Sequence, residues 1–245
     1  MPGVPVSSPL DQLPEYRVRV SDRARRVRLT VTPREGLVVV VPRRWRGDPA
    51  SLVAEKAEWV RAALATYADR HALFSAGPEA LLPDAIELGA LGEVWPVEYR
   101  TTSSASVRAS VDGGMLVVSG DVGDAEKCLG ALRRWLDRTA REGLLPLLAQ
   151  TAAEAGLAYE SARVRSQRTR WGSCSARRTI SLNRNLVFLP RHLVRSLMLH
   201  ELAHTLVMNH SKDFWTTLAV FDPDARDHRK QMREAHDFIP AWAEA

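Results

Sequence analysis

The sequence has few of the features that mark secreted, disulfide-bonded or membrane proteins. It has only two cysteines, Cys128 and Cys174, which are too few for a disulfide framework. Its first residues lack a basic segment followed by an apolar stretch, so we expect no signal peptide. The longest apolar runs, such as Leu37 to Val41, fall far short of the ~20 residues that a membrane span needs. We therefore expect a soluble, cytoplasmic protein that binds no membrane.

Acidic residues are in the minority, and the formal net charge is +5. Much of the positive charge lies in the first fifth of the chain. The arginines there are Arg17, Arg19, Arg23, Arg25, Arg26, Arg28, Arg34, Arg43, Arg44 and Arg46. A basic face can attract nucleic acid or an acidic partner, whereas arginines on the solvent side of strands are the plainer explanation. Because no recognition motif accompanies the charge, nucleic-acid binding through the basic N-terminal region is the lesser of the two interpretations.

The chain divides by pattern into three regions. Residues 1–14 carry four prolines and are predicted to be a flexible tail. Residues 15–120 are predicted to form an N-terminal region of β-meander and helix, since short alternating or apolar runs are followed by the helix start Asp48-Pro49. Three further predicted strands and a helix from about Asp124 follow in the same order, which indicates either a duplicated unit or two unrelated hairpins. Residues 121–245 form the predicted third region.

The third region contains an apolar helical segment from Pro190 to Met208, with its end predicted at a left-handed Asn209. It carries the sequence His200-Glu-Leu-Ala-His204. Residues four apart lie on one side of a helix, so both imidazoles can bind a single ion, and Glu201 lies about 100° away, where it can take a proton from water. Two core histidines bonded to neighbours are the alternative, but burying these polar groups without a partner is costly.

A catalytic zinc takes three protein ligands and leaves one position open. His210 is the favoured third ligand, because a turn at Asn209 would bring it back toward the ion. The other candidates are His228, His236, Asp222, Asp224 and Asp227. Ser211 is predicted to be the N-cap of the next helix, whose aromatic residues pack beneath the site.

Several motifs together carry a family resemblance. They are Arg168-Thr-Arg-Trp-Gly-Ser-Cys-Ser175, Ile180-Ser-Leu-Asn183, Leu186 to Pro190, His200-Glu-Leu-Ala-His204 and Asn209-His-Ser-Lys-Asp-Phe-Trp215. In this order they resemble the YgjP-like metal-dependent hydrolases, a branch of the gluzincin-like zinc peptidases, and more distantly the SprT and Spartan type proteases. The resemblance implies Zn2+, the ligands His200, His204 and His210, and Glu201 as catalytic base. Many gluzincins use a downstream Glu as third ligand, and the Asn209-His210 pattern departs from that.

The fold class expected from these features is α+β. A β-rich N-terminal region with helices would precede a compact zincin-like metallopeptidase domain, built from a small sheet and an active-site helix. Peptide substrates of such enzymes can add to a strand edge along the cleft, and the segment 179–183 is the candidate edge. Arg170, Trp171 and Asn183 are the candidate substrate-binding residues. Trp171 as a core aromatic, Gly172 as a tight turn and Cys174 as a buried filler are the plainer interpretations.

The sequence leaves the oxyanion-stabilising group open, because all four tyrosines precede residue 160. His228, Arg229, Asn185 and Arg170 are the candidates. The favoured hypothesis is a zinc hydrolase, most specifically a peptidase that acts on peptide or protein substrates. The alternatives are a DNA-associated protein or DNA–protein crosslink protease using the Arg-rich region, and a metal-stabilised domain without turnover.

Overall fold

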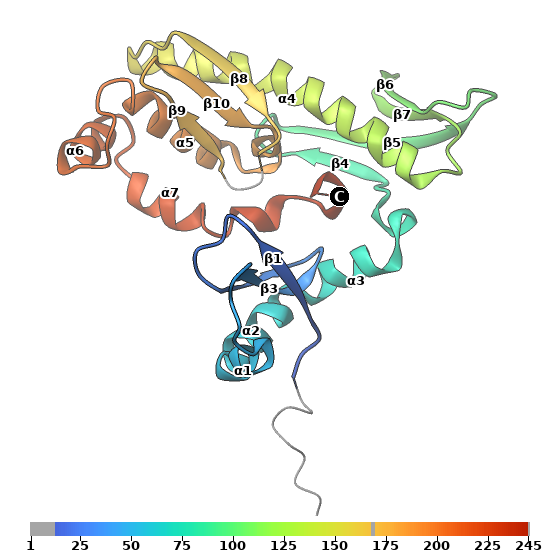
Figure 1. The fold of residues 1–245 in the computed structure, drawn as a ribbon. Coiled ribbons are helices and arrows are strands. Elements are labelled where there is room, and N and C mark those ends of the chain that lie inside the picture. Colours follow the sequence, from blue (N-terminus) through green and yellow to red (C-terminus); the bar gives the residue numbers. More distant parts are fainter. Residues whose placement is uncertain (1–12, 168–169, 245) are drawn as a thin grey trace, which may run out of the picture. The chain divides into compact units, whose positions relative to one another are not determined.

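A computed structural model describes residues 13–167 and 170–244, and its elements are mixed helices and strands (Figure 1). The predicted α+β class is confirmed. The chain divides into two compact units, one ending at Leu81 and the other spanning Leu82–Glu244. Most of the predicted tail, residues 1–12, lies outside the described residues. Within the described ranges, no helix combines the length and apolarity that a membrane span requires.

The first unit consists of a three-stranded sheet followed by helices. Its elements are β1 (Tyr16–Ser21), β2 (Arg28–Thr32), β3 (Gly36–Pro42), α1 (Pro49–Glu55), α2 (Ala57–Thr66), α3 (Ala68–Ala76) and the 3-10 turn η2 (Pro78–Leu81). The strand order is β1-β3-β2, with β1 parallel and β2 antiparallel to β3. The strands therefore form no meander, because the wholly apolar β3 occupies the centre, where both of its edges are paired. Asp48 caps α1 by accepting from the backbone N–H groups of Ala50 and Ser51, as predicted.

The second unit begins with a four-stranded sheet and a long helix. Its first elements are β4 (Ala85–Leu88), β5 (Glu93–Thr101), β6 (Arg108–Asp112), β7 (Met115–Gly120) and α4 (Ala125–Ala155). In β5, β6 and β7 the third strand is again central, parallel to the first and antiparallel to the second. The recurrence seen in the sequence therefore extends to the strand pairing. The unit boundary falls well before the predicted boundary at residue 120, because α4 packs on β6 and β7.

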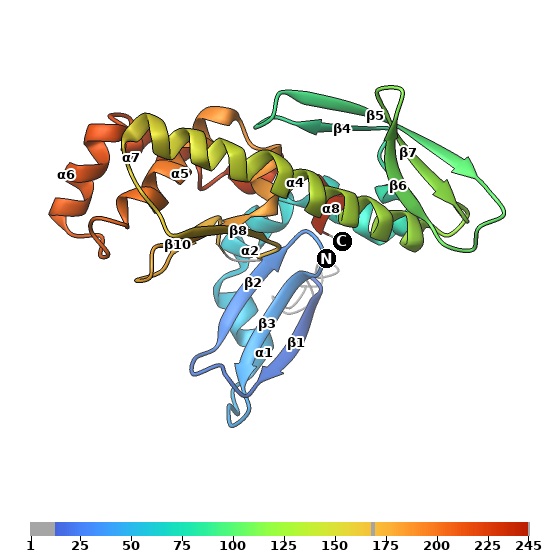
Figure 2. The same cartoon turned by 90° about the horizontal axis from the view of Figure 1, so that it is seen from above.

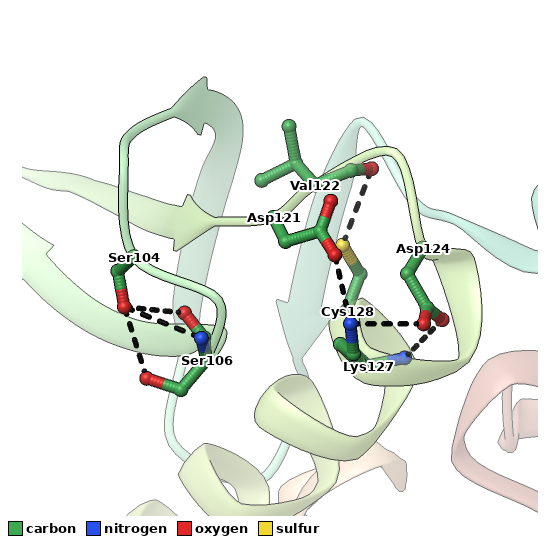
Figure 3. A network of polar contacts seen from close by, with 7 residues as sticks. All are labelled: Ser104, Ser106, Asp121, Val122, Asp124, Lys127 and Cys128. Carbon is green, nitrogen blue, oxygen red and sulfur yellow. Dashed lines mark hydrogen bonds and ion pairs between the residues drawn. The ribbon is translucent and has the colours of Figure 1, made fainter.

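Helix α4 starts at a compact polar network (Figure 3). Asp124 is its N-cap and accepts from the backbone N–H of Lys127 at 3.1 Å, while Lys127 Nζ lies 2.7 Å from Asp121 Oδ2. Helix α4 runs through Pro146 without a break. Its buried stripe, which includes Leu144 and Leu148 on either side of the proline, compensates for the missing backbone donor. Figure 2 shows α4 extending past both sheets of this unit.

The rest of the second unit holds the predicted site. Its elements are β8 (Ser161–Arg165), β9 (Gly172–Cys174), β10 (Thr179–Asn183), η3 (Arg184–Phe188), α5 (Arg191–Ala203), α6 (Lys212–Phe221), α7 (Ala225–Gln231), η4 (Ala235–Phe238) and α8 (Ala241–Glu244). The strand order is β8-β10-β9. The expectation that residues 179–183 form the sheet edge is therefore wrong: β10 is buried at the centre, and the short β9, which contacts α5, forms the edge.

Candidate metal centre

Helix α5 ends earlier than the sequence indicates. It stops at Ala203, and His204 is the C-cap. The helix was expected to reach about Met208 and to end at a left-handed Asn209, but Arg178 is the only non-glycine residue with positive φ among the described residues. Thr205 Oγ1 instead donates to Leu202 O at 2.8 Å, which ends the helix locally. Asn209 Oδ1 accepts from Ser211 N at 3.2 Å, a side-chain turn that leads into α6.

The turn after α5 brings three imidazoles together. One ring nitrogen from each of His200, His204 and His210 lies within 4.8 Å of the other two, and the described parts of the chain hold no second such group of His, Cys, Asp or Glu. The Nε2 atoms of His200 and His210 are 3.1 Å apart. His204 Nδ1 lies 3.0 Å from Val207 O, and a proton shared with that oxygen leaves Nε2 to face the others. We call these residues the imidazole triad.

Aromatic side chains of α6 support the imidazole triad. Ser211 caps this helix through Phe214 N, as predicted. The buried Phe214 ring stacks on His204, with centroids 4.4 Å apart, and meets His200 and His210 edge-on at 4.9 Å. The predicted aromatic packing beneath the site is thus present. Because a closely packed ring restricts the rotamers of its neighbours, the three imidazoles are held in one arrangement before any ion binds.

Burial favours the neutral form of two members of the triad, His200 and His210. It lowers the pKa of His200 to about 4, and the neighbouring imidazoles and Arg229 act in the same direction. The pKa of His210 is lowered as well, first by burial and then by His204 and Arg229. Neutral imidazole is the form that ligates a metal, so protons compete weakly for these nitrogens at neutral pH. Three imidazole donors fit a divalent zinc ion, whose tetrahedral ligands lie about 3.3 Å apart for bonds of ~2.0–2.1 Å.

Glu201 projects from α5 toward Gly172 of the edge strand β9. It is buried, and burial raises the pKa of its carboxyl to about 7, against smaller opposing effects of a backbone hydrogen bond from Cys174 and the charge of Arg170. A methyl group at Gly172 would lie only 2.8 Å from Glu201 Oε1. Glycine is therefore required there, a requirement that the tight-turn interpretation of Gly172 missed. An isolated glycine in a strand is the signal that could have revealed it.

An open cleft of about 250 Å³ adjoins His200 and Glu201. Its other lining residues are Arg170, Trp171, Gly172, Ser196, Leu197, Trp215, Leu218, Ala225, Arg229 and Met232. Two of the three predicted substrate-binding residues, Arg170 and Trp171, are thus at the cleft. The Trp171 ring also packs on His236, with centroids 4.8 Å apart. Cleft walls that combine two arginines with two tryptophans can contact both the backbone and the side chains of a ligand.

Asn183 is placed differently from the other two. It is buried at the end of β10, and its Nδ2 donates to Gln167 O at 2.7 Å and to Arg170 O at 2.9 Å. Its Oδ1 accepts from Asn185 N at 3.1 Å. Both polar atoms of the Asn183 side chain are therefore already hydrogen-bonded to other residues of the protein. Asn183 therefore fixes the segment that presents Arg170 and Trp171, and it does not line the cleft.

The alternative third ligands belong to other contacts. Asp222 accepts from Ser196 Oγ, and His228 Nδ1 lies 3.0 Å from Asp222 Oδ2. We call Ser196, Asp222 and His228 the Asp222 network. Asp227 pairs with Lys230 at 2.7 Å. Neither these residues nor Asp224 and His236 join the converging group of ligand atoms. The geometry brings together His200, His204 and His210.

The remaining candidates separate in the same way. Of the four groups considered for oxyanion stabilisation, Arg170 and Arg229 line the cleft, whereas His228 and Asn185 do not. Cys174 is a half-buried free thiol. Burial and the charge of Glu201 raise its pKa, which disfavours the thiolate that a nucleophile needs.

A cluster of three imidazoles beside a small sheet is an arrangement expected of a metallopeptidase. Comparison with family models bears this out: residues 25–235 match the YgjP-like, metallopeptidase domain. The chain belongs to this YgjP-like family, and the resemblance seen in the sequence is confirmed. No curated protein and no solved structure matches the chain significantly. The match supports no nucleic-acid partner, so the DNA-associated alternative lacks support.

Proposed function

We propose that this protein is a zinc-dependent peptidase, with His200, His204 and His210 as metal ligands and Glu201 as general base. One observation carries the proposal: three ring nitrogens converge within 4.8 Å beside a buried carboxyl group, at an open cleft. A purely structural metal site has no use for such a carboxyl group or for a cleft. The metallopeptidase family match independently supports a hydrolytic role.

The donor set favours zinc among the divalent metals. It consists of imidazole nitrogens, without a thiolate, and imidazole suits zinc in three-ligand hydrolytic sites. When bound, zinc lowers the pKa of a coordinated water toward ~7 and polarises the scissile carbonyl. The bond between His204 Nδ1 and Val207 O orients the ring and supports this ligand from behind. Phe214 excludes water from the same side.

Glu201 is the residue that moves the proton. Its carboxylate takes a proton from the attacking water and returns it to the nitrogen of the leaving amine. A general base works best when its pKa lies near the working pH, and burial brings the pKa of Glu201 to about 7. Gly172 leaves the space that the carboxylate occupies. Arg170 and Arg229, which line the cleft, are the cations available to stabilise the oxyanion.

The substrate class follows from strand β9. Among the described strands it pairs with β10 alone. On its other edge the Cys174 N–H bonds to Glu201, and the backbone of Gly172 lies at the cleft, where it can meet a ligand. An extended peptide can hydrogen-bond to such an edge as an additional strand. Arg170 and Trp171 directly precede β9 and would contact side chains of the bound peptide. Asn183 serves this step indirectly, because it fixes the backbone at Arg170.

Metal analysis combined with a peptide-library digest tests the proposal. Wild-type protein should bind one zinc ion per chain and cleave peptides, and chelation should abolish cleavage until zinc is restored. Glu201→Gln should keep the zinc but lose at least about a hundredfold in kcat, as expected for loss of general-base catalysis. Other divalent metals, added to the apoprotein in turn, test the preference for zinc. Unimpaired turnover by zinc-loaded Glu201→Gln would overturn the mechanism.

A further inference from the structure

A second hollow, of about 330 Å³, adjoins the cleft of the metal centre. It is lined by Trp215, Arg226, Arg229, Lys230 and Arg233. Trp215 and Arg229 line both hollows, so the two are neighbours that share one wall. Arg226, Arg229 and Arg233 are spaced by three and four residues, which places them on one face of α7 and the turn that follows it. Four cationic side chains around one aromatic ring make this basic pocket.

The charge of the basic pocket is only partly neutralised within the protein. Lys230 Nζ is paired with Asp227 at 2.7 Å. In residues 13–167 and 170–244, no carboxylate lies within ion-pair distance of Arg226, Arg229 or Arg233. The guanidinium carbon of Arg229 instead lies 5.0 Å from the centre of the Trp215 ring, a cation–π contact that holds it at the mouth of the cleft. Unpaired guanidinium groups that converge on a hollow are suited to an anionic ligand.

The basic pocket is close to the point of cleavage. The Trp215 ring lies 6.2 Å from the His200 ring and 6.1 Å from the His210 ring, measured between centroids. Together with the 5.0 Å between Trp215 and Arg229, these distances place the Arg229 guanidinium within about 11 Å of the His200 ring centre. An extended peptide advances about 3.3 Å per residue. A substrate bound at the metal centre can therefore reach the basic pocket within about three residues.

We infer that the basic pocket is a specificity subsite that binds a carboxylate of the peptide substrate, close to the scissile bond. The inference rests on the proposed peptidase function. The carboxylate is either an Asp or Glu side chain or the C-terminal carboxylate of the peptide. Arg226, Arg229 and Arg233 bind it, while the Trp215 ring contacts the aliphatic part of the same residue. The enzyme thus prefers acidic peptides, or releases short C-terminal fragments.

Two matched peptide series distinguish the sources of the carboxylate. In the first series, Asp or Glu is placed at each of the three positions on either side of the cleaved bond, with Asn or Gln as partner. In the second, a free C-terminus is compared with the amide. We expect kcat/KM to be about tenfold higher for one carboxylate peptide than for its neutral partner at low ionic strength, and the ratio to shrink with added salt.

The double variant Arg226→Gln/Arg233→Gln should bring that ratio close to one. Arg141→Gln/Arg191→Gln is the matched control, because it removes the same charge from exposed arginines outside the basic pocket and should leave the ratio unchanged. Peptide affinity for zinc-loaded Glu201→Gln, measured by fluorescence anisotropy, reports the same preference without turnover. If the carboxylate peptides bind more tightly but the wild-type protein cleaves none of them, the subsite inference stands and the proposed peptidase function is wrong. Equal cleavage of every pair would overturn the subsite.

Discussion

Two groups of histidines lie on or beside α5, and their surroundings differ. In the Asp222 network, His228 Nδ1 is 3.0 Å from a carboxylate oxygen, and the nearby His192 Nε2 is 3.2 Å from Gln231 Oε1. The His192 and His228 rings are 5.6 Å apart. The rings of the imidazole triad are slightly closer, at 4.7 to 5.1 Å, but the nearest partner of His200 Nε2 is another imidazole nitrogen.

The difference separates a structural group from a ligand set. An imidazole that faces an oxygen acceptor is satisfied by one proton, so the Asp222 network needs nothing from outside. In the imidazole triad the ring nitrogens face one another. Two of them can share one proton, but all three can be satisfied together only by a bound cation. Ring spacing alone is therefore a poor sign of a metal site. The chemical type of the facing atoms is the better one.

Among the variants that test this comparison, we expect the largest effect from replacing a residue of the imidazole triad. Replacing His200 by Ala removes one of three ligands, so zinc content should fall well below one per chain. Hydrolysis should fall by at least about a thousandfold, a loss of several kcal/mol of transition-state stabilisation. Zinc content by mass spectrometry and peptide turnover measure both effects.

His192→Ala is the matched control for His200→Ala. His192 lies on the same helix, two turns earlier, and its ring has an oxygen partner. This variant should keep full zinc occupancy and turnover. Loss of zinc from both variants would show that the comparison is wrong and that the metal site extends into the second group.

A smaller effect is expected when the carboxyl group is displaced while the ligands stay. Gly172→Ala places a methyl group 2.8 Å from Glu201 Oε1 and 2.9 Å from its Cγ, so the side chain must shift. Zinc should remain bound, and kcat should fall by about a hundredfold, the order expected for a misplacement of about 1 Å. Gly130→Ala is the control, since the nearest atom there is the flexible end of Arg134 at 3.4 Å. A fully active Gly172→Ala would show that the space left by Gly172 does not fix the position of Glu201.

In the metal-free protein, Glu201 and His200 should both make the free energy of unfolding depend on pH. Burial raises the pKa of Glu201 from 4.5 to about 7, so between these values the folded state binds more protons and acidification stabilises it. Burial lowers the pKa of His200 from 6.5 to about 4, so there the unfolded state binds more protons and acidification destabilises the fold. The two contributions oppose each other between about pH 6.5 and 4.5.

Urea unfolding of the chelated protein between pH 7 and 5 can separate these contributions. Glu201→Gln should lose stability on acidification by about 1 kcal/mol per pH unit, because only the destabilising contribution remains. The free energy of unfolding of His200→Ala should instead rise or stay constant on acidification. The wild type should lie between the two. If the free energy of unfolding depended on pH in the same way in all three proteins, the opposing contributions of Glu201 and His200 would be contradicted.

Local patterns in the sequence were sufficient to predict the parts of the site that lie within one helix. The spacing of His200, Glu201 and His204 follows from helix periodicity, and the caps at Asp48 and Ser211 follow from residue type alone. The end of α5 was mispredicted because it depends on side-chain bonds of His204 and Thr205, which a pattern of apolar residues does not contain.

Features that depend on distant pairing could not be predicted. The order β8-β10-β9 is decided by which strand is buried on both sides, and sequence alone placed the edge on the wrong strand. Gly172 was considered as a turn, although its role depends on Glu201, which lies far along the chain. The basic pocket was missed because its arginines lie on α7 and the turn after it, and α7 is a helix of only seven residues that shows no apolar periodicity.

The smallest effect is expected from the Asp222 network. His228→Ala removes a partner of the buried Asp222, which then keeps Ser196 as its remaining donor. The expected cost is about 1–3 kcal/mol in the free energy of unfolding, as for other buried groups left partly unsatisfied. Zinc content should stay at one per chain. His228→Gln, which can still donate to the carboxylate, should recover part of the lost stability. Because the network packs α5 against α6 and α7, loss of zinc from a folded His228→Ala protein would show that it also positions the imidazole triad.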